Sequence, residues 1–157
     1  MSYSVSTLLT RNLHDVFGEN DPERRRAAID DIFTEDGVFY DPSKGVYRGR
    51  DEIDRVAGAI RATHPDFRYQ PIAGPEELGN GGRIQWVSGR PGEAPAYAGT
   101  DFIIVGDGRI AALALSRCRR SVAVNVAGNR RQAAADAAAQ VRNEPARSSL
   151  KCGRRSR

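Results

Sequence analysis

Cysteine is scarce in this chain of 157 residues, which has only two. Cys118 and Cys152 both lie late in the chain and outside any spacing that is typical of a metal site. Without a secretion signal, a disulfide between them is not expected. We therefore assign the cysteines no function and predict no metal site.

Long hydrophobic runs are also missing, since no apolar stretch approaches the roughly 18 residues that a membrane-spanning helix needs. The first residues lack the basic residue, the apolar stretch and the small-residue cleavage site of a signal peptide. These absences predict a soluble cytoplasmic protein without a membrane partner. The length suits one domain with its own hydrophobic core.

Aromatic side chains are absent after Phe102, although the chain has five Tyr, five Phe and one Trp. Residues 114–157 carry 11 Lys/Arg against 2 Asp/Glu, whereas residues 1–113 carry 13 against 18. The pI of about 9.4 therefore comes from the end of the chain. We predict a folded domain over residues 1–115 and a basic, alanine/arginine-rich tail over residues 116–157, partly helical or disordered.

This basic tail has two further interpretations. Clustered arginines neutralise phosphates, so the tail is expected to make non-specific contacts with nucleic acid at most. Specific recognition is not expected, because neither interleaved aromatic residues nor a known binding motif accompanies the arginines. Alternatively, a shifted reading frame in a GC-rich gene would produce the same composition, a hypothesis that peptide mass mapping of the C-terminus tests.

Apolar residues recur at helical spacing in three segments of the first half of the chain. The pattern predicts helices over residues 5–18, 22–33 and 50–63. Asp21 followed by Pro22 is a typical helix start, and the proline that follows His64 ends the third helix. The first two helices should form a hairpin.

Between and after these helices the apolar pattern changes to the period of two that is typical of strands. A short hairpin is predicted over residues 38–41 and 46–48. Four further strands are predicted over residues 67–78, 83–88, 96–105 and 109–115, with glycine-rich turns between them. Because helices and strands are segregated along the chain, the predicted fold class is α+β.

Two aspartates, Asp41 and Asp101, lie within apolar strand segments and are the best candidates for chemistry. A carboxylate on an apolar face is costly unless it is paired, protonated or placed in a wet pocket. Asp41 shares a face with Phe39, but as the residue before a proline turn it can equally accept backbone hydrogen bonds. Asp101 shares a face with Ile103, but it can also bind Arg109, Arg48 or a backbone amide. Both alternatives stay open for each aspartate.

Three short stretches resemble motifs of the nuclear-transport-factor-2-like superfamily, particularly its SnoaL-like and ketosteroid-isomerase-like members. They are residues 32–42, 47–53 and 106–110, and their order and spacing carry the resemblance, which covers about residues 5–115. The resemblance implies a cone: a strongly curved antiparallel sheet packed against three N-terminal helices, with an apolar pocket at its open end. It also implies a homodimer.

The resemblance further implies an acid–base site. Asp41, followed by a proline, matches the proton-shuttling base of the ketosteroid isomerases. Asp101 matches the strand position of a neutral aspartic acid that donates a hydrogen bond to the developing oxyanion, the case that an apolar environment makes possible. The family's tyrosine on the first helix has no match, because its position falls near Leu13 and His14. No metal or organic cofactor is implied.

The expected ligand is a small apolar or ring-containing molecule. The candidate pocket-lining residues are mostly large apolar side chains: Leu13, His14, Phe17, Phe33, Phe39, Trp86, Tyr97 and Ile103. Core packing accounts for most of these aromatic residues equally well. Two functions remain open: an isomerase, cyclase or dehydratase acting on a carbon acid, or a non-catalytic module for ligand binding or dimerisation.

Overall fold

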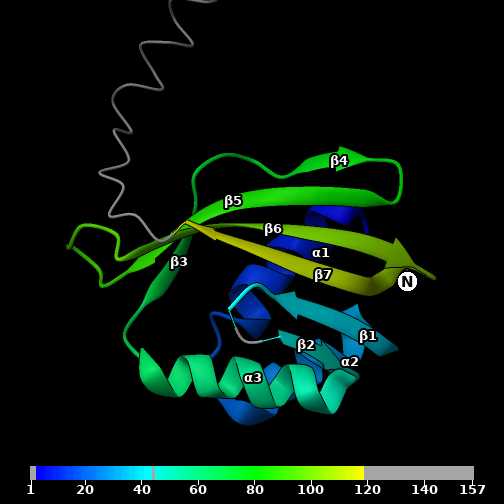
Figure 1. Ribbon diagram of the computed structural model, residues 1–157, viewed down its shortest axis with the longest axis horizontal. Helices are drawn as coiled ribbons and strands as arrows, with labels where there is room; N and C mark the ends of the chain where they lie inside the picture. The colour runs from blue at the N-terminus through cyan, green and yellow to red at the C-terminus, as the bar shows by residue number, and fades with distance from the viewer. Residues whose placement is uncertain (1–2, 44, 119–157) are drawn as a thin grey trace, which may run out of the picture. The chain divides into compact units, whose positions relative to one another are not determined.

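The computed structural model describes residues 3–43 and 45–118, in which helices pack on one face of a seven-stranded sheet (Figure 1). The helical elements are α1 (Val5–Arg11), the π-helical turn η1 (Asn12–Val16), α2 (Pro22–Ile32) and α3 (Arg50–Thr63). The strands are β1 (Phe33–Asp41), β2 (Gly45–Arg48), β3 (Arg68–Pro71), β4 (Glu76–Leu78), β5 (Gly81–Gly89), β6 (Tyr97–Gly106) and β7 (Arg109–Cys118).

The first predicted helix consists of α1 and the wider turn η1. Ser4 caps α1 by accepting a hydrogen bond from the Thr7 amide at 3.1 Å. The Phe17 amide donates to the Asn12 carbonyl, five residues back, which is the hydrogen bond of a π-helix. Gly18 follows where a Cβ would lie 2.7 Å from the His14 carbonyl oxygen, so the close return of the chain requires glycine.

The sheet has the order β2-β1-β7-β6-β5-β3, with β4 also paired to β5. The α+β class, the curvature of the open sheet and the three helical segments confirm the predicted fold. The prediction of an antiparallel sheet was wrong in one place, because β1 lies parallel to β7, with Phe39 beside Leu113. Alternation along a strand indicates which face is buried but carries no information on the direction of its neighbour.

Several predicted boundaries differ from the observed ones. Phe33, predicted to end the second helix, has extended backbone and begins β1. The predicted strand over residues 67–78 is divided into β3 and β4 after Pro71, which lacks the amide that a continuing ladder needs. The last strand extends beyond its predicted end to Cys118. The rest of the predicted basic tail lies outside the described residues.

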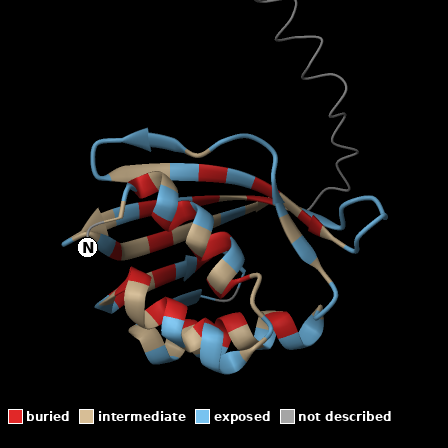
Figure 2. Ribbon diagram, turned by 180° about the vertical axis from the view of Figure 1, so that it is seen from behind, coloured by how far each residue is buried: buried red, intermediate tan, exposed pale blue. Residues whose placement is uncertain are grey.

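One hydrophobic core lies between the helices and the covered face of the sheet, and Figure 2 shows buried positions on both layers. A nearly buried ion pair ties two of the helices together, since Arg25 of α2 donates to Asp54 of α3 at 2.8 Å. Among the described helices, none has the length and apolar character to cross a membrane.

Candidate functional site

A buried carboxylate, Asp101 of β6, forms the centre of the candidate site. Asp101 is only 4% exposed, and each of its oxygens accepts one hydrogen bond. The Trp86 indole donates to Oδ1 at 2.9 Å, and the Asn12 side-chain amide donates to Oδ2 at 3.1 Å. Within the described residues Asp101 forms no ion pair, and Arg109 instead donates to the carbonyl of Asp31. Asp101 therefore does not pair with Arg109, which was one of the alternatives that the sequence left open.

Two local features place these donors beside Asp101. Trp86 of β5 lies opposite Gly99 of β6 in the sheet register. A Cβ on Gly99 would lie 2.6 Å from the indole Cζ2, so the missing side chain lets the indole lie flat across β6 toward Asp101. Asn12 is fully buried at the first position of η1, in line with Leu8 and Leu9 on the inward face of the helix.

Burial raises the pKa of Asp101 to about 6, because the surrounding apolar groups disfavour the charged form. The hydrogen bonds from Trp86 and Asn12 act in the opposite direction but do not cancel this effect. Near neutral pH, Asp101 is therefore poised to exchange a proton, as a general acid or base must be.

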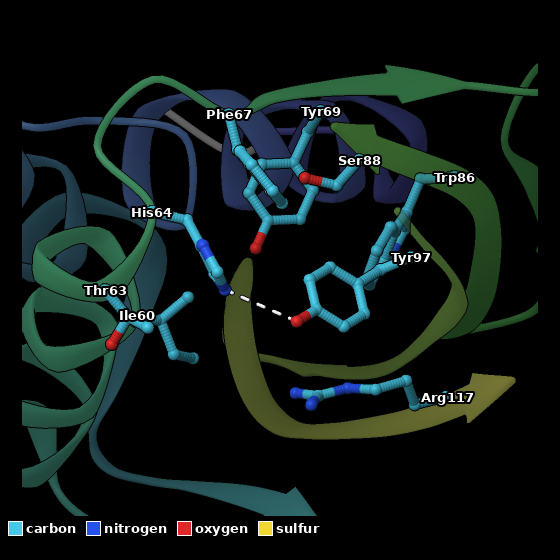
Figure 3. Close-up of a pocket in the computed structure, with 9 residues that line it drawn as sticks. All are labelled: Ile60, Thr63, His64, Phe67, Tyr69, Trp86, Ser88, Tyr97 and Arg117. Atoms are coloured by element: carbon cyan, nitrogen blue, oxygen red, sulfur yellow. Dashed lines mark hydrogen bonds between the residues drawn. The ribbon is translucent and has the colours of Figure 1, made fainter. Parts of the chain in front are cut away.

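A water-sized inner cavity of about 20 Å³ lies against Asp101. Its walls are mainly apolar and aromatic: Leu13, Phe17, Phe39, Ile60, Tyr69, Trp86, Leu113, Leu115 and Arg117 complete the lining. A wider outer pocket of about 200 Å³ shares Ile60, Tyr69, Trp86 and Arg117 with it. The outer pocket, drawn in Figure 3, therefore adjoins the inner cavity through these four shared residues.

Polar groups at the outer pocket come from the end of α3 and from the sheet. The His64 ring stacks on the Phe67 ring, with their centroids 4.3 Å apart. The Nε2 atom of His64 lies 3.3 Å from the Tyr97 hydroxyl. Buried Arg61 holds this segment by donating to the carbonyls of Pro65 at 2.8 Å and Phe67 at 3.1 Å. Figure 3 shows the hydroxyl of Tyr69 pointing into the same space.

Tyr69 stays neutral in this pocket, because burial raises the pKa of its hydroxyl to about 12. Its ring meets the Trp86 indole edge to face, with centroids 5.0 Å apart. The Tyr69 hydroxyl is thus available as a hydrogen-bond donor rather than as a base.

The second candidate, Asp41, is also only 4% exposed and lies at the end of β1. Its Oδ1 accepts the Ser43 amide at 2.8 Å, as an aspartate in a turn does, while its buried Oδ2 has no hydrogen-bond partner among the described residues. Such an orphaned buried oxygen is costly unless another group meets it. Asp41 therefore combines the structural role with an unused acceptor.

The two aspartates lie on the same face of the sheet, separated by one strand. Asp101 pairs with Leu115 of β7, and Tyr40 of β1 pairs with Ala114, so Asp41 occupies the next position, beside Leu115. Two strand spacings correspond to about 10 Å between the Cα atoms of Asp41 and Asp101. Asp101 lines the inner cavity, and Asp41 lines neither the inner cavity nor the outer pocket.

The other predicted pocket residues are distributed over three environments. Leu13, Phe17, Phe39 and Trp86 line the inner cavity, and Trp86 and Tyr97 line the outer pocket. Phe33 and Ile103 are buried in the core and line neither space. His14 does not line them either, because it points outward from η1 and is exposed.

Sequence reasoning missed several residues of the site. For Asn12 a signal existed, because it is a polar residue on the apolar helix stripe four positions after Leu8. No comparable signal marked Tyr69 or Arg117, because each becomes part of the pocket only through strand pairing. In the described part of the chain, no group of three or more His, Cys, Asp or Glu side chains is placed to hold a metal ion.

Comparison with solved structures finds the same fold. A proposed isomerase of the SnoaL-like family from Agrobacterium tumefaciens is 25% identical, with a TM-score of 0.67 over 73% of this chain and 97% of that one. A proposed polyketide cyclase from Sinorhizobium meliloti is 20% identical, with a TM-score of 0.54 over 70% and 94%. A ketosteroid isomerase-like protein from Catenulispora acidiphila, in complex with trimethylamine, is 16% identical, with a TM-score of 0.61 over 79% and 95%.

Among curated proteins, no sequence matches the chain. The family model of the SnoaL-like domain, however, matches residues 10–113, a span that includes Asp41, Asp101 and most of the lining of both spaces. The motifs of the sequence had predicted this superfamily, and the prediction is confirmed by the family match and by the shared fold. The chain belongs to the SnoaL-like domain family, within the nuclear-transport-factor-2-like superfamily.

Proposed function

We propose that this protein is an acid–base enzyme that acts on a small ring-containing carbon acid, as an isomerase, cyclase or dehydratase. The observation that carries the proposal is Asp101, a buried carboxyl group at a cavity, with two neutral donors and no cationic partner among the described residues. A merely structural buried carboxylate would usually have a charged partner. The proposed isomerase and polyketide cyclase among the structural relatives support this class of chemistry.

In the proposed reaction, Asp41 is the base and Asp101 is the acid. The reaction requires the bound ligand to displace the side chains between the inner cavity and Asp41, whose buried Oδ2 lines neither space in this structure. Oδ2 then accepts a proton from a carbon next to a carbonyl group, and the C–H electron pair moves into the carbonyl to form an enolate. The protonated form of Asp101 donates a hydrogen bond to the enolate oxygen. Return of the proton from Asp41 to another carbon completes an isomerisation, and the chain needs no external oxidant or reductant for these steps.

This proposal implies a limited pH range. Asp101 must be protonated to donate, so the rate should fall as the pH rises through its pKa of about 6. Asp41 must be ionised to accept a proton, so Asp41→Asn should abolish the reaction. A non-catalytic binding module would bind the same ligands whether or not Asp101 is protonated and whether or not Asp41 is replaced by Asn.

Carboxyl-carbon NMR titration of the labelled protein tests the proposal. A titration midpoint for Asp101 near 6 is expected, and a value near the ordinary 4 would contradict the proposal. The Asp101→Asn variant assigns the resonance. If Asp101 titrates normally, the non-catalytic module becomes the better hypothesis.

We also propose that the protein forms a homodimer through the open face of its sheet. Tyr40, Val46, Phe102 and Ile104 are between 43% and 50% exposed there. Strand register aligns Phe102, Ala114, Tyr40 and Val46 in one row across four strands. Side chains of this kind on a continuous face favour a protein interface. Sedimentation velocity should give a dimer for the wild type and a monomer for Phe102→Glu; a monomeric wild type would contradict the proposal.

A further inference from the structure

An arginine without an acidic partner in the described structure lines both the inner cavity and the outer pocket. Arg117 of β7 is half-buried and forms no hydrogen bond or ion pair with any described residue. Its guanidinium carbon lies 5.9 Å from the centroid of the Tyr97 ring, at the limit of a cation–π interaction. Buried Arg25 and Arg61, in contrast, each donate to oxygen atoms of the protein. The N–H donors of the Arg117 guanidinium therefore have no acceptor among the described residues.

The position of Arg117 relates it to both aspartates. It lies two residues beyond Leu115 on the same strand, and Leu115 stands between Asp41 and Asp101 in the sheet register. A separation of one strand spacing and two residues corresponds to about 8 Å between the Cα atom of Arg117 and that of each aspartate. Arg117 also lines the inner cavity together with Asp101.

The size and walls of the outer pocket limit the ligand. Its volume of about 200 Å³ is below the range of roughly 300 to 1,000 Å³ that is typical of sites for drug-sized molecules. Four of its nine lining residues are aromatic, namely Phe67, Tyr69, Trp86 and Tyr97. Flat aromatic walls around a volume of this size suit a single ring with a short substituent.

The charge of the pocket lining indicates the chemical class of this substituent. The lining of the outer pocket includes one arginine and no acidic residue, and in Figure 3 the guanidinium of Arg117 lies below the Tyr97 ring. A guanidinium presents a planar pair of donors that matches a carboxylate. A phosphate group would carry about two charges at neutral pH, which one arginine does not balance.

We propose that the ligand is a single-ring carboxylate, whose ring lies between Trp86 and Tyr97 and whose carboxylate binds Arg117. This inference rests on the proposed function only for the chemical step, in which the carbon that loses a proton would belong to the same ring. It does not depend on that function for binding. Arg117 is in this view a specificity residue, which selects anionic rings over neutral ones.

Binding can be followed through Trp86, because it is the single tryptophan of the chain and lines both spaces. The probes are benzoate and its neutral counterpart benzamide, titrated against the full chain at pH 7. Wild type should bind benzoate at least about tenfold more tightly than benzamide, the preference expected of a charge-assisted hydrogen bond. Arg117→Gln should bind both probes equally, because benzoate loses its charged partner.

Arg68→Gln is the matched control, because Arg68 is an exposed arginine of β3 that lines neither space. This variant removes the same net charge and should keep the preference for benzoate. Equal binding of the two probes by wild type, loss of the preference in Arg68→Gln, or absence of binding by both probes would overturn the inference. The pKa of Asp101 is measured without ligand, so failure of the proposed chemistry and failure of carboxylate selection are distinguishable.

Discussion

The indole nitrogen of Trp86 and the carboxylate of Asp101 lie on neighbouring strands and are joined by a 2.9 Å hydrogen bond. The two residues are not directly opposite in the register, since Trp86 pairs with Gly99 and Asp101 pairs with Ile84. The indole therefore reaches diagonally across β6, and the space for it is the space that Gly99 leaves. The protonation state of Asp101 is thus coupled to the packing of the Trp86 indole.

The first prediction concerns stability and pH. The folded-state pKa of Asp101, about 6, is above its ordinary value of 3.8, so the folded protein binds this proton more tightly than the unfolded chain does. The corresponding stabilisation is complete below about pH 4 and is lost as the pH rises through 6, a change of about 3 kcal/mol. Urea unfolding between pH 4 and 8 measures it.

In the urea-unfolding experiment, Asp101→Asn should remove the part of the pH dependence of stability that Asp101 causes. Its side-chain oxygen can still accept from Trp86, and the Asn12 amide can turn to present its own oxygen, which has no partner among the described residues. The variant should therefore be at least as stable as wild type at pH 7. A variant that keeps the full slope between pH 4 and 6 would show that another group is responsible.

The second prediction is that Trp86→Phe raises the pKa of Asp101 above 6. The hydrogen bond from the indole stabilises the charged form, so removal of the donor makes ionisation harder. The lost hydrogen bond should also lower the free energy of unfolding at pH 7 by about 1–3 kcal/mol. Carboxyl-carbon NMR reads the pKa. A fall in the pKa would mean that water replaces the indole as a better donor.

The third prediction is that Gly99→Ala displaces the indole. The new methyl group would lie 2.6 Å from Cζ2 of Trp86, closer than packed carbon atoms allow, and we expect a cost of about 1–3 kcal/mol. Tryptophan fluorescence and urea unfolding measure both effects. Gly74→Ala is the matched control, because nothing lies within 4 Å of its added Cβ, and it should leave fluorescence and stability unchanged.

The fourth prediction concerns Arg61, which positions the segment that carries His64 and Phe67. Arg61→Met keeps much of the length of the side chain but removes its donors to Asn20 and to the carbonyls of Pro65 and Phe67. We expect a loss of about 2 kcal/mol in the free energy of unfolding.

Faster hydrogen exchange is also expected in Arg61→Met at the Phe67 amide, which donates to the His64 carbonyl. Arg55→Met, at an exposed ion pair with Glu52, is the control and should change neither quantity appreciably. Unchanged exchange at Phe67 in Arg61→Met would show that the segment is held by its ring contacts alone.

The sequence predicted most of what depends on local periodicity. Helical spacing and the Asp21-Pro22 cap predicted the helices to within a few residues, and strand alternation placed Asp101 on the covered face. Phe33 was misplaced because its apolar character suits the end of a buried helix and the start of a buried strand equally well. Local patterns of this kind do not separate the two.

What the sequence did not predict depends on contacts between distant residues. The partners of Asp101 come from η1 and from the next strand, 89 and 15 residues away, and no spacing rule connects them. His14 was predicted as a pocket residue because it lies beside the position of the family's tyrosine, but the buried residues Asn12, Leu13 and Val16 form the inward face of the helix and leave His14 exposed.

The parallel pairing of β1 with β7 has a consequence for the order of folding. β7 lies between β1 and β6, so it separates and spaces the strands that carry Asp41 and Asp101. A nascent chain that ends before Arg109 already contains both aspartates, yet the strand between them is not yet made. Because such long-range pairing forms late and slowly, the two acids come into register only when the last strand inserts.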